Sequence, residues 1–446
     1  MADTVNAIDL IPVLEKGLTA DLANLTKWDN YLEGEQPLKY MSEAMKEELG
    51  DTAVELVLNW ARLVADAYEN RLDVEGFRYA DSDTEDADLW ACWQYNDMDE
   101  QSQQGHLDSL ALSRAYVLIS SNEEKDKPPR NTVESPFQVW AQRDPKTRKV
   151  NAAIKKWKDL DKVEHVLVYT PAETVEFVKD GGDWKQDGFE DKHNFGIVPV
   201  VPLVNKPRLL RPDGMTEFRD IIPLADAANK MATDMMTSAE FHAMPRRWAF
   251  GLKASDFVDR QGNPVSSWSK IKGRLWASEN KDVNVGTFPE ADLANFHGTI
   301  KLLAQLTSQL AALPPHYMGF NSDNPPSADA MRSSESQLVK KVERKHTFLG
   351  GAWEDVQRIN LMFMRGKPEL EDRDYQLETV WRDPSTPTVA QVADAAVKKY
   401  ESGLVPLEQT RIDLGYSATQ REQMRKMDEE SSPANQIAGI VKANAA

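Results

Sequence analysis

One charge triplet resembles part of a nuclease motif and is the first candidate for chemistry. Glu190-Asp191-Lys192 matches the last part of a motif whose carboxylates hold a divalent metal ion. In that motif a Pro-Asp pair precedes the triplet, whereas here Pro212-Asp213 follows it. Because the order is reversed and such triplets are common by chance, nuclease activity is kept only as an alternative.

Other catalytic and metal-binding patterns are missing from the sequence. It contains no phosphate-binding G-x-x-x-x-G-K-[ST] loop, no G-x-G-x-x-G, and no H-E-x-x-H among its 7 histidines. The acidic run 81–88 fails as a calcium loop, because Asp86 and Cys92 occupy the positions that require Gly and Glu. Cys92 is the single cysteine, so an intramolecular disulfide and a thiolate cluster are excluded. We therefore expect no enzyme activity, no catalytic residue, no metal and no cofactor.

The charge of the chain is strongly negative but unevenly distributed. Its 53 basic and 72 acidic residues give −19, the opposite sign from a conventional DNA-binding protein. Residues 244–288 reverse this balance, with eight basic residues against four acidic ones. Two interpretations of that segment stay open, an ordinary solvated surface or a docking surface for a protein or DNA. The basic residues are Arg246, Arg247, Lys253, Arg260, Lys270, Lys272, Arg274 and Lys281.

A second basic cluster falls in a predicted helix. It consists of Lys340, Lys341, Arg344 and Lys345. Glu335 and Glu343 are helical neighbours of these residues, which favours a solvated face over a binding site.

The length of 446 residues predicts two to four structural units. No apolar run reaches the roughly 18 residues that cross a bilayer, and the first residues lack the pattern of a secretory signal. We expect a protein that is made and used in a reducing compartment, or one that has no need of disulfides.

The N-terminal half is predicted to begin with helices and to continue with strands. Leucines at helical spacing predict helices over 7–68 with a break at 33–37. Short β-rich runs follow at 115–119, 137–141, 163–169 and 174–178, with hairpin turns at 181–183 and 187–188. The apolar run 197–203 contains two prolines, so we expect an edge or extended segment.

The C-terminal half is predicted to be mainly helical. Thr216 is the expected N-cap of a helix to Ala243 that Pro223 interrupts. After a Gly- and Pro-containing insert, a second helix ends at Pro314-Pro315 and a polar loop follows. Ser327 is the expected N-cap of a helix to Arg365, on the order of 55 Å long, with a kink at Gly350-Gly351. A strand at 375–382 and short helices with a polar tail over 388–446 complete an α+β, mainly helical chain.

Several stretches, taken together and in order, resemble the portal proteins of long-tailed bacteriophages over roughly residues 28–365. The stretches are 31–34 with 36–38, 59–66 with 71–77, 93–99, 113–117, 198–205 with 216–218, 313–319 and 326–330. Residues after about 385 resemble the family least.

The resemblance implies a portal fold with a wing, stem, clip and crown. The wing would comprise residues 1–215, the first stem helix 216–243, the clip 244–289 and the second stem helix 290–313. A tunnel loop at 314–326 would precede a long kinked helix and returning wing strand at 327–385. Residues 386–446 would form the crown helices and tail.

The resemblance also implies a function and partners. The chain would form a ring, typically of twelve copies, at one capsid vertex of the virion, after synthesis in the host cytoplasm. Double-stranded DNA would pass through its channel during packaging and ejection, without sequence-specific binding. Its partners would be the large terminase subunit, the head–tail adaptor, the major capsid protein and a scaffold, with no membrane involved.

The residues that would serve these roles are predicted on the same basis. DNA would meet the polar tunnel loop at His316, Asn321, Ser322 and Asn324. Docking would use the basic clip residues Arg246, Arg247, Lys253, Lys270, Lys272 and Arg274. Twelve chains at −19 each carry −228, so we expect an acidic channel that repels phosphates. A non-portal capsid protein remains a further alternative.

Overall fold

The computed structural model describes the chain in segments. They are residues 6–39, 56–82, 84–124, 126–243, 247–250, 284–287, 293–319, 327–385, 389–416 and 418–431. The described residues divide into two compact units, Met1–Pro384 and Ser385–Ala446. Helices and antiparallel strands are both present, which confirms the predicted α+β class with its helical majority.

The first helices of the chain follow the predicted leucine pattern. They are α1 (Ala7–Ala20), α2 (Leu22–Glu33) and α4 (Trp60–Glu69). Gly34 ends α2 with φ +76°, a left-handed conformation that suits glycine, so the predicted break is confirmed. Buried leucines and isoleucine of α1 pack on the sheet that contains β5 and β6.

Two antiparallel sheets form the β part of the first unit. The larger follows the order β4 (Val139–Arg143), β5 (Val150–Lys158), β6 (Glu164–Tyr169), β7 (Thr174–Asp180) and β8 (Asp183–Asp191). The other has the order β3 (Arg130–Glu134), β2 (Arg114–Ser120) and β9 (Val200–Val204). Within the described strands β9 lies at the edge, as the prolines predicted.

One of the two predicted hairpin turns is wrong. Gly181-Gly182 joins β7 to β8, as expected. Asp187-Gly188 instead lies inside β8, where the register with β7 shifts. Gly188 has φ +95° at this irregularity, and the backbone N–H of Phe189 donates to Glu176 Oε2 at 3.0 Å. A glycine with positive φ serves a bulge as well as a turn, which explains the error.

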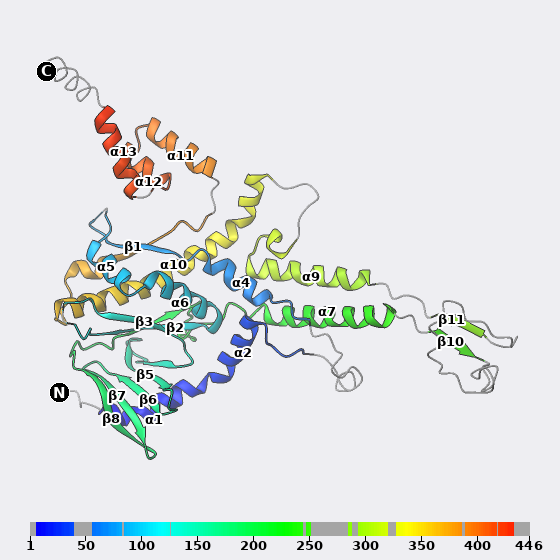
Figure 1. Cartoon of the computed structure of the whole chain (residues 1–446), viewed down its shortest axis with the longest axis horizontal. Helices are drawn as coiled ribbons and strands as arrows, with labels where there is room; N and C mark the ends of the chain where they lie inside the picture. The colour runs from blue at the N-terminus through cyan, green and yellow to red at the C-terminus, as the bar shows by residue number, and fades with distance from the viewer. Residues whose placement is uncertain are drawn as a thin grey trace. The chain divides into compact units, whose positions relative to one another are not determined.

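The main core of the first unit lies between the β2 sheet and two helices. α6 (Met98–Leu112) packs over β2 and β3, and α10 (Ala328–Arg365) packs over β2 and β9 (Figure 1). α5 (Ala87–Tyr95) and the antiparallel pair β1 (Val74–Tyr79) and β12 (Leu377–Trp381) complete this region. Trp93 and Trp353 meet edge to face in the core, with ring centroids 5.0 Å apart.

α10 is one continuous helix that includes Gly350-Gly351, the position of the predicted kink, and it changes direction along its length in Figure 1. A Cβ at Gly350 would lie 3.1 Å from Trp381 Nε1, and Thr379 Oγ1 donates to the Gly350 carbonyl at 3.1 Å. The first glycine therefore allows β12 to approach the helix closely. Ser327 caps α10 as predicted, since its Oγ accepts from the backbone N–H of Ala330.

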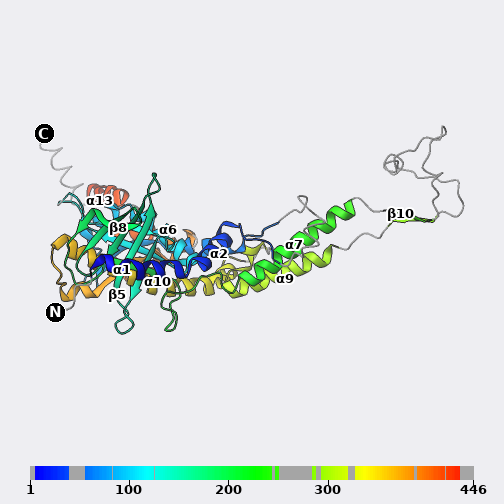
Figure 2. The same cartoon turned by 90° about the horizontal axis from the view of Figure 1, so that it is seen from below.

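A pair of helices runs side by side in both views (Figures 1 and 2). They are α7 (Ile222–Ala243) and α9 (Ala294–Ala311). Between them in sequence, β10 (Arg247–Phe250) pairs antiparallel with β11 (Asn284–Thr287). After α9 comes the short 3₁₀ helix η3 (Pro315–Met318), and η4 (Asp372–Gln376) precedes β12.

The predicted start of α7 was wrong. Thr216 Oγ1 accepts from the backbone N–H of Phe218, but the helix begins only at Ile222. The backbone N–H of Glu217 donates to the carbonyl of Leu110 on α6 at 2.8 Å, which holds this stretch outside the helix. Pro223 consequently falls in the first turn, where its missing N–H costs nothing, and does not interrupt α7.

The second unit contains the predicted short C-terminal helices. They are α11 (Val389–Glu401), α12 (Leu407–Asp413) and α13 (Ala418–Ser431). Arg411 of α12 pairs with Asp428 of α13 at 2.5 Å. The predicted polar tail lies outside the described residues.

Candidate functional site

The helix pair α7–α9 and the contacts that hold it to the rest of the first unit form the candidate site. The two helices pack against each other, and each carries small buried side chains. They are Ala228, Ala232 and Thr233 on α7 and Ala304, Thr307 and Ser308 on α9. Small side chains permit a close approach of two helix backbones.

The N-terminal half of α7 is held by buried polar contacts. Asp226 accepts from Tyr31 at 2.5 Å and from Lys39 Nζ at 2.7 Å. Burial, together with the hydrogen bond to Asp226, raises the pKa of Tyr31 to about 12. Asn229, one turn later, accepts from the backbone N–H of Leu58 at 2.7 Å. Both contacts join α7 to segments more than 170 residues earlier.

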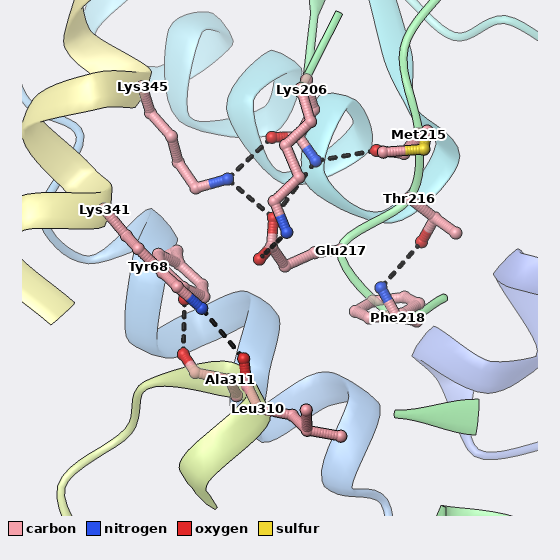
Figure 3. A network of polar contacts seen from close by, with 11 residues as sticks. Tyr68, Lys206, Met215, Thr216, Glu217, Phe218, Leu310, Ala311, Lys341 and Lys345 are labelled. Carbon is pink, nitrogen blue, oxygen red and sulfur yellow. Dashed lines mark hydrogen bonds and ion pairs between the residues drawn. The ribbon is translucent and has the colours of Figure 1, made fainter. Parts of the chain in front are cut away.

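A buried ion cluster lies where α9 ends (Figure 3). Lys345 Nζ on α10 donates to Glu217 Oε2 and to Asn205 Oδ1, both at 2.7 Å. Lys206 Nζ donates to Glu217 Oε1 at 2.6 Å. The side chain of Glu217 is 2% exposed and that of Lys345 is 6% exposed. The cluster therefore places two lysines on one buried carboxylate, Lys345 away from water and Lys206 with a side chain that is 38% exposed.

The electrostatics of this cluster keep Glu217 ionised. Burial would raise the pKa of Glu217, but the charges and hydrogen bonds of Lys345 and Lys206 outweigh it and lower that pKa to about 2. Burial lowers the pKa of Lys345, and the attraction of Glu217 offsets part of this. Removal of the carboxylate would leave both lysines without their counter-ion.

The same region holds the C-terminal carbonyls of α9 (Figure 3). Tyr68 on α4 donates its hydroxyl to the Ala311 carbonyl at 2.5 Å, and Lys341 Nζ donates to the Leu310 carbonyl at 2.9 Å. Lysine at a helix C-terminus also complements the helix dipole. Ala312 then takes a left-handed conformation with φ +55°, which ends the helix. The end of α9 is thus fixed against α4 and α10.

The basic cluster on α10 is only in part the solvated face that the sequence favoured. Arg344 and Lys340 are exposed as predicted, with Lys340 2.7 Å from Glu343, whereas Lys341 is half-buried and Lys345 is buried. The prediction was wrong for Lys345 because its partners lie 128 and 140 residues earlier in the chain. A basic run inside a helical pattern was the only signal of this cluster in the sequence.

The predicted tunnel-loop residues are only partly within the described chain. His316 is half-buried in η3, and its ring meets that of Tyr317 edge to face at 4.9 Å. Arg71 Nη2 donates to the Tyr317 hydroxyl at 3.1 Å, so η3 is held to the segment between α4 and β1. The other three residues, Asn321, Ser322 and Asn324, lie outside the described residues.

The predicted clip residues also lie almost wholly outside the described chain. Arg247 is the first residue of β10 and pairs with Thr287 in β11. Arg246, Lys253, Lys270, Lys272 and Arg274 fall outside the described residues. The docking role of these six residues stays a prediction.

The residues that the sequence singled out for chemistry have other contacts in the described part of the chain. The described residues hold no group of three or more His, Cys, Asp or Glu side chains that could bind a metal ion. In the suspected nuclease triplet, Glu190 pairs with Lys192 at 2.9 Å and Asp191 accepts from the backbone N–H of Ser121. Burial raises the pKa of the Cys92 thiol to about 12, which makes it a poor nucleophile. Among the described helices, none has the length and apolar character to cross a bilayer.

Comparisons with known proteins find extensive similarity to portal proteins. The family model described as phage portal protein, SPP1 Gp6-like, matches residues 13–436. The portal proteins of Mycobacterium phages L5 and D29 are each 36% identical over 386 residues, which cover 84% of this chain and 79% of theirs. A solved structure described as the neck of an empty GTA particle aligns over 85% of this chain and 95% of that chain, with a TM-score of 0.45 and 12% identity.

Proposed function

The chain belongs to the SPP1 Gp6-like family of phage portal proteins, and we propose that its copies form a closed ring, typically of twelve, around a channel for double-stranded DNA. This membership confirms the resemblance predicted from the sequence. It places the chain in the phage virion, as part of the capsid. The observation that carries the proposal is the match over residues 13–436, which includes both helices of the α7–α9 pair.

We assign the parts of the ring subunit as the sequence predicted. The first unit up to about residue 215 is the wing, and the α7–α9 pair is the stem. Residues 244–289 form the clip, 314–326 the tunnel loop, 327–385 the long helix and wing strand, and 386–446 the crown. The fixed end of α9 supports this assignment, because a loop that borders a channel needs a rigid helix behind it.

The proposed mechanism of DNA passage is electrostatic repulsion. With −19 per chain, a ring has an acidic surface that resists close, long-lived contact with phosphates. DNA can then slide in both directions, in packaging and in ejection. Exchangeable hydrogen bonds at His316, Asn321, Ser322 and Asn324 are the proposed contacts. No catalytic residue, metal or cofactor takes part in this role.

The proposed partners differ between the two ends of the ring. The basic clip docks the large terminase subunit during packaging and the head–tail adaptor afterwards. The wing meets the major capsid protein and, during assembly, a scaffold. The subunit is made in the host cytoplasm and requires no membrane.

Electron microscopy of the purified full chain in negative stain tests the ring. We expect closed rings with a central hole. Closed shells would instead identify a non-portal capsid protein, and monomers at high concentration would contradict ring formation. Incubation of the same sample with linear duplex DNA and Mg²⁺ should leave the DNA uncut, and cleavage would restore the nuclease alternative.

A further inference from the structure

A short rigid arm projects from the first unit between β9 and α7. We define the arm as residues 206–215. The backbone N–H of Arg208 donates to the Arg211 carbonyl at 3.0 Å, and that of Arg211 donates to the Arg208 carbonyl at 2.8 Å. Leu209 and Leu210 therefore form the tip of a tight hairpin, where they are 83% and 93% exposed. Two adjacent leucines held in water by a closed hairpin indicate a contact surface.

The base of the arm is fixed by the ion cluster described above (Figure 3). The backbone N–H of Met215 donates to the Asn205 carbonyl at 3.0 Å, and Asn205 Nδ2 donates back to the Met215 carbonyl at 2.9 Å. Lys206 closes the same base through Glu217. Gly214 has φ +78°, and a Cβ there would collide with the Asn205 carbonyl oxygen. A preformed arm loses little conformational freedom when it docks.

The charge of the arm indicates the chemistry of its partner. Arg208 and Arg211 flank the leucines, and both are exposed. Neither has a recorded ion pair within the described part of the chain. The matching surface is an apolar floor with an acidic rim, and a chain of −19 is itself a source of such surfaces.

One cavity of the first unit has this chemistry. It has a volume of about 530 Å³ and is lined by the apolar side chains of Trp90 and Val74. Four carboxylates, a single arginine, Ser102 and Gln103 complete its mostly polar wall. The charged residues are Asp73, Glu75, Glu85, Asp99 and Arg382. The arginine pairs with Asp73 and Glu75, so among the described residues of the wall the carboxylates without an ion pair are Glu85 and Asp99, and the charge of the wall is negative. We call this the Trp90 cavity.

The arm and the Trp90 cavity are formed by different elements of the first unit. The arm follows β9, the last strand of the sheet in the order β3-β2-β9. The cavity is lined by residues from β1, α5 and the first turns of α6, and by no residue of the arm or of β9. A second groove, lined by Phe348 and Met362, also contains Pro207 and Pro212 of the arm, so it shares the arm's own side. A ring joins two different sides of its subunits, which favours the Trp90 cavity as the receiver.

We propose that the arm of each copy docks into the Trp90 cavity of the next copy, with Leu209 and Leu210 against Trp90 and the two arginines at the carboxylates. This inference rests on the proposed function, since it requires that the copies form a ring. It assigns one specific contact that holds neighbouring wings together.

The first test replaces the leucines in the full chain and measures assembly by mass photometry. The double variant Leu209→Ser with Leu210→Ser should weaken association between copies on the order of 100-fold or more, because two buried leucines are lost. The matched control is Leu160→Ser, a 101% exposed leucine in the β5–β6 turn, which should assemble like the unchanged chain. Circular dichroism should show both variants folded, since all three side chains lie in solvent.

The second test identifies the receiver by thiol crosslinking. Cys92 is buried, so a chain with Leu210→Cys and Gln103→Cys carries two accessible thiols. A short bismaleimide should link these copies into a ladder of multimers on a denaturing gel. Leu160→Cys with Gln103→Cys is the control and should give far less ladder.

The outcomes separate this inference from the proposed function. If the unchanged chain forms no rings, the proposed function fails. If the unchanged chain forms rings and the double serine variant assembles equally well, the arm contact alone is overturned. If the serine variant fails to assemble but the cysteine pair gives no ladder within rings of the cysteine variant, the Trp90 cavity is the wrong receiver and the inference is also overturned.

Discussion

Lys345 and Glu217 form a buried ion pair of 2.7 Å between residues that are 128 positions apart. The pair joins the long helix α10 to the stretch that leads into α7. Lys206 shares the same carboxylate, and Tyr68 and Lys341 hold the end of α9 beside it. One cluster thus determines where the arm, the start of the proposed stem and its end lie relative to one another.

Removal of the shared carboxylate should destabilise the first unit strongly. Glu217→Gln leaves the buried Lys345 without a counter-ion and removes the partner of the more exposed Lys206, and we expect a loss of about 3–5 kcal/mol in unfolding free energy. The measurement is urea unfolding followed by tryptophan fluorescence. Glu190→Gln is the control, because its pair with Lys192 is exposed and should contribute less than about 1 kcal/mol. Equal midpoints for the two variants would contradict the importance of the cluster.

The cluster should also make the stability of the fold depend on pH in the acidic range. The pKa of Glu217 falls from 4.5 to about 2 on folding, so its contribution is complete above pH 4.5 and is lost as the pH falls toward 2. A shift of this size corresponds to about 3 kcal/mol. Thermal unfolding of the unchanged chain and Glu217→Gln should therefore converge in this interval. A difference in melting temperature between the two proteins that stays constant from pH 6 to pH 2 would contradict the prediction.

Neighbouring glycines of α10 should respond differently to the same substitution. Gly351→Ala adds a Cβ with no atom within 4 Å and should stabilise the helix by about 1 kcal/mol. Gly350→Ala gains the same helix propensity but presses its Cβ against Trp381 at 3.1 Å. We expect a clearly smaller gain or a net loss, measured as the difference between the two midpoints of urea unfolding. Equal gains in stability for the two variants would show that β12 packs on α10 without needing a glycine at position 350.

The hydroxyl of Tyr68 should contribute more to the unfolding free energy than the hydroxyl of an exposed tyrosine. Tyr68→Phe leaves the Ala311 carbonyl without its partner in a buried site, and we expect a loss of about 1–3 kcal/mol. Tyr95→Phe serves as the control, because that ring is 45% exposed and water can replace the lost contact with Asn122. The measurement is again the unfolding free energy in urea. Equal losses of stability in the two variants would contradict the proposal that Tyr68 holds the end of α9.

Charge reversal in the proposed clip should separate assembly from docking. Replacement of Arg246, Arg247, Lys270 and Lys272 by Glu should leave rings intact in the microscope but abolish binding of the terminase or the adaptor. A matched control reverses four exposed wing residues, Lys146, Arg148, Lys149 and Lys162, with the same change in net charge. Normal packaging and tail attachment with the clip variant would contradict the docking role.

Features that depend on nearby residues were predictable from the sequence. The Ser327 cap, the end of α9 before Pro314-Pro315 and the edge position of the strand with Pro202 each follow from backbone geometry within a few residues. The ordered resemblance over residues 28–365 was also sufficient to predict the family.

Only the tertiary structure decided which charged side chains are buried and which contact each glycine serves. Lys345 and Lys340 look alike in sequence, yet one is buried on Glu217 and the other lies in solvent. Gly188 looked like a turn but serves a bulge, and Gly350 serves a close helix–strand contact. The partners of Lys345 and Gly350 come from separate elements of the chain, and the bulge at Gly188 depends on pairing with the neighbouring strand β7. Burial and pairing across such separations depend on packing, which local spacing does not encode.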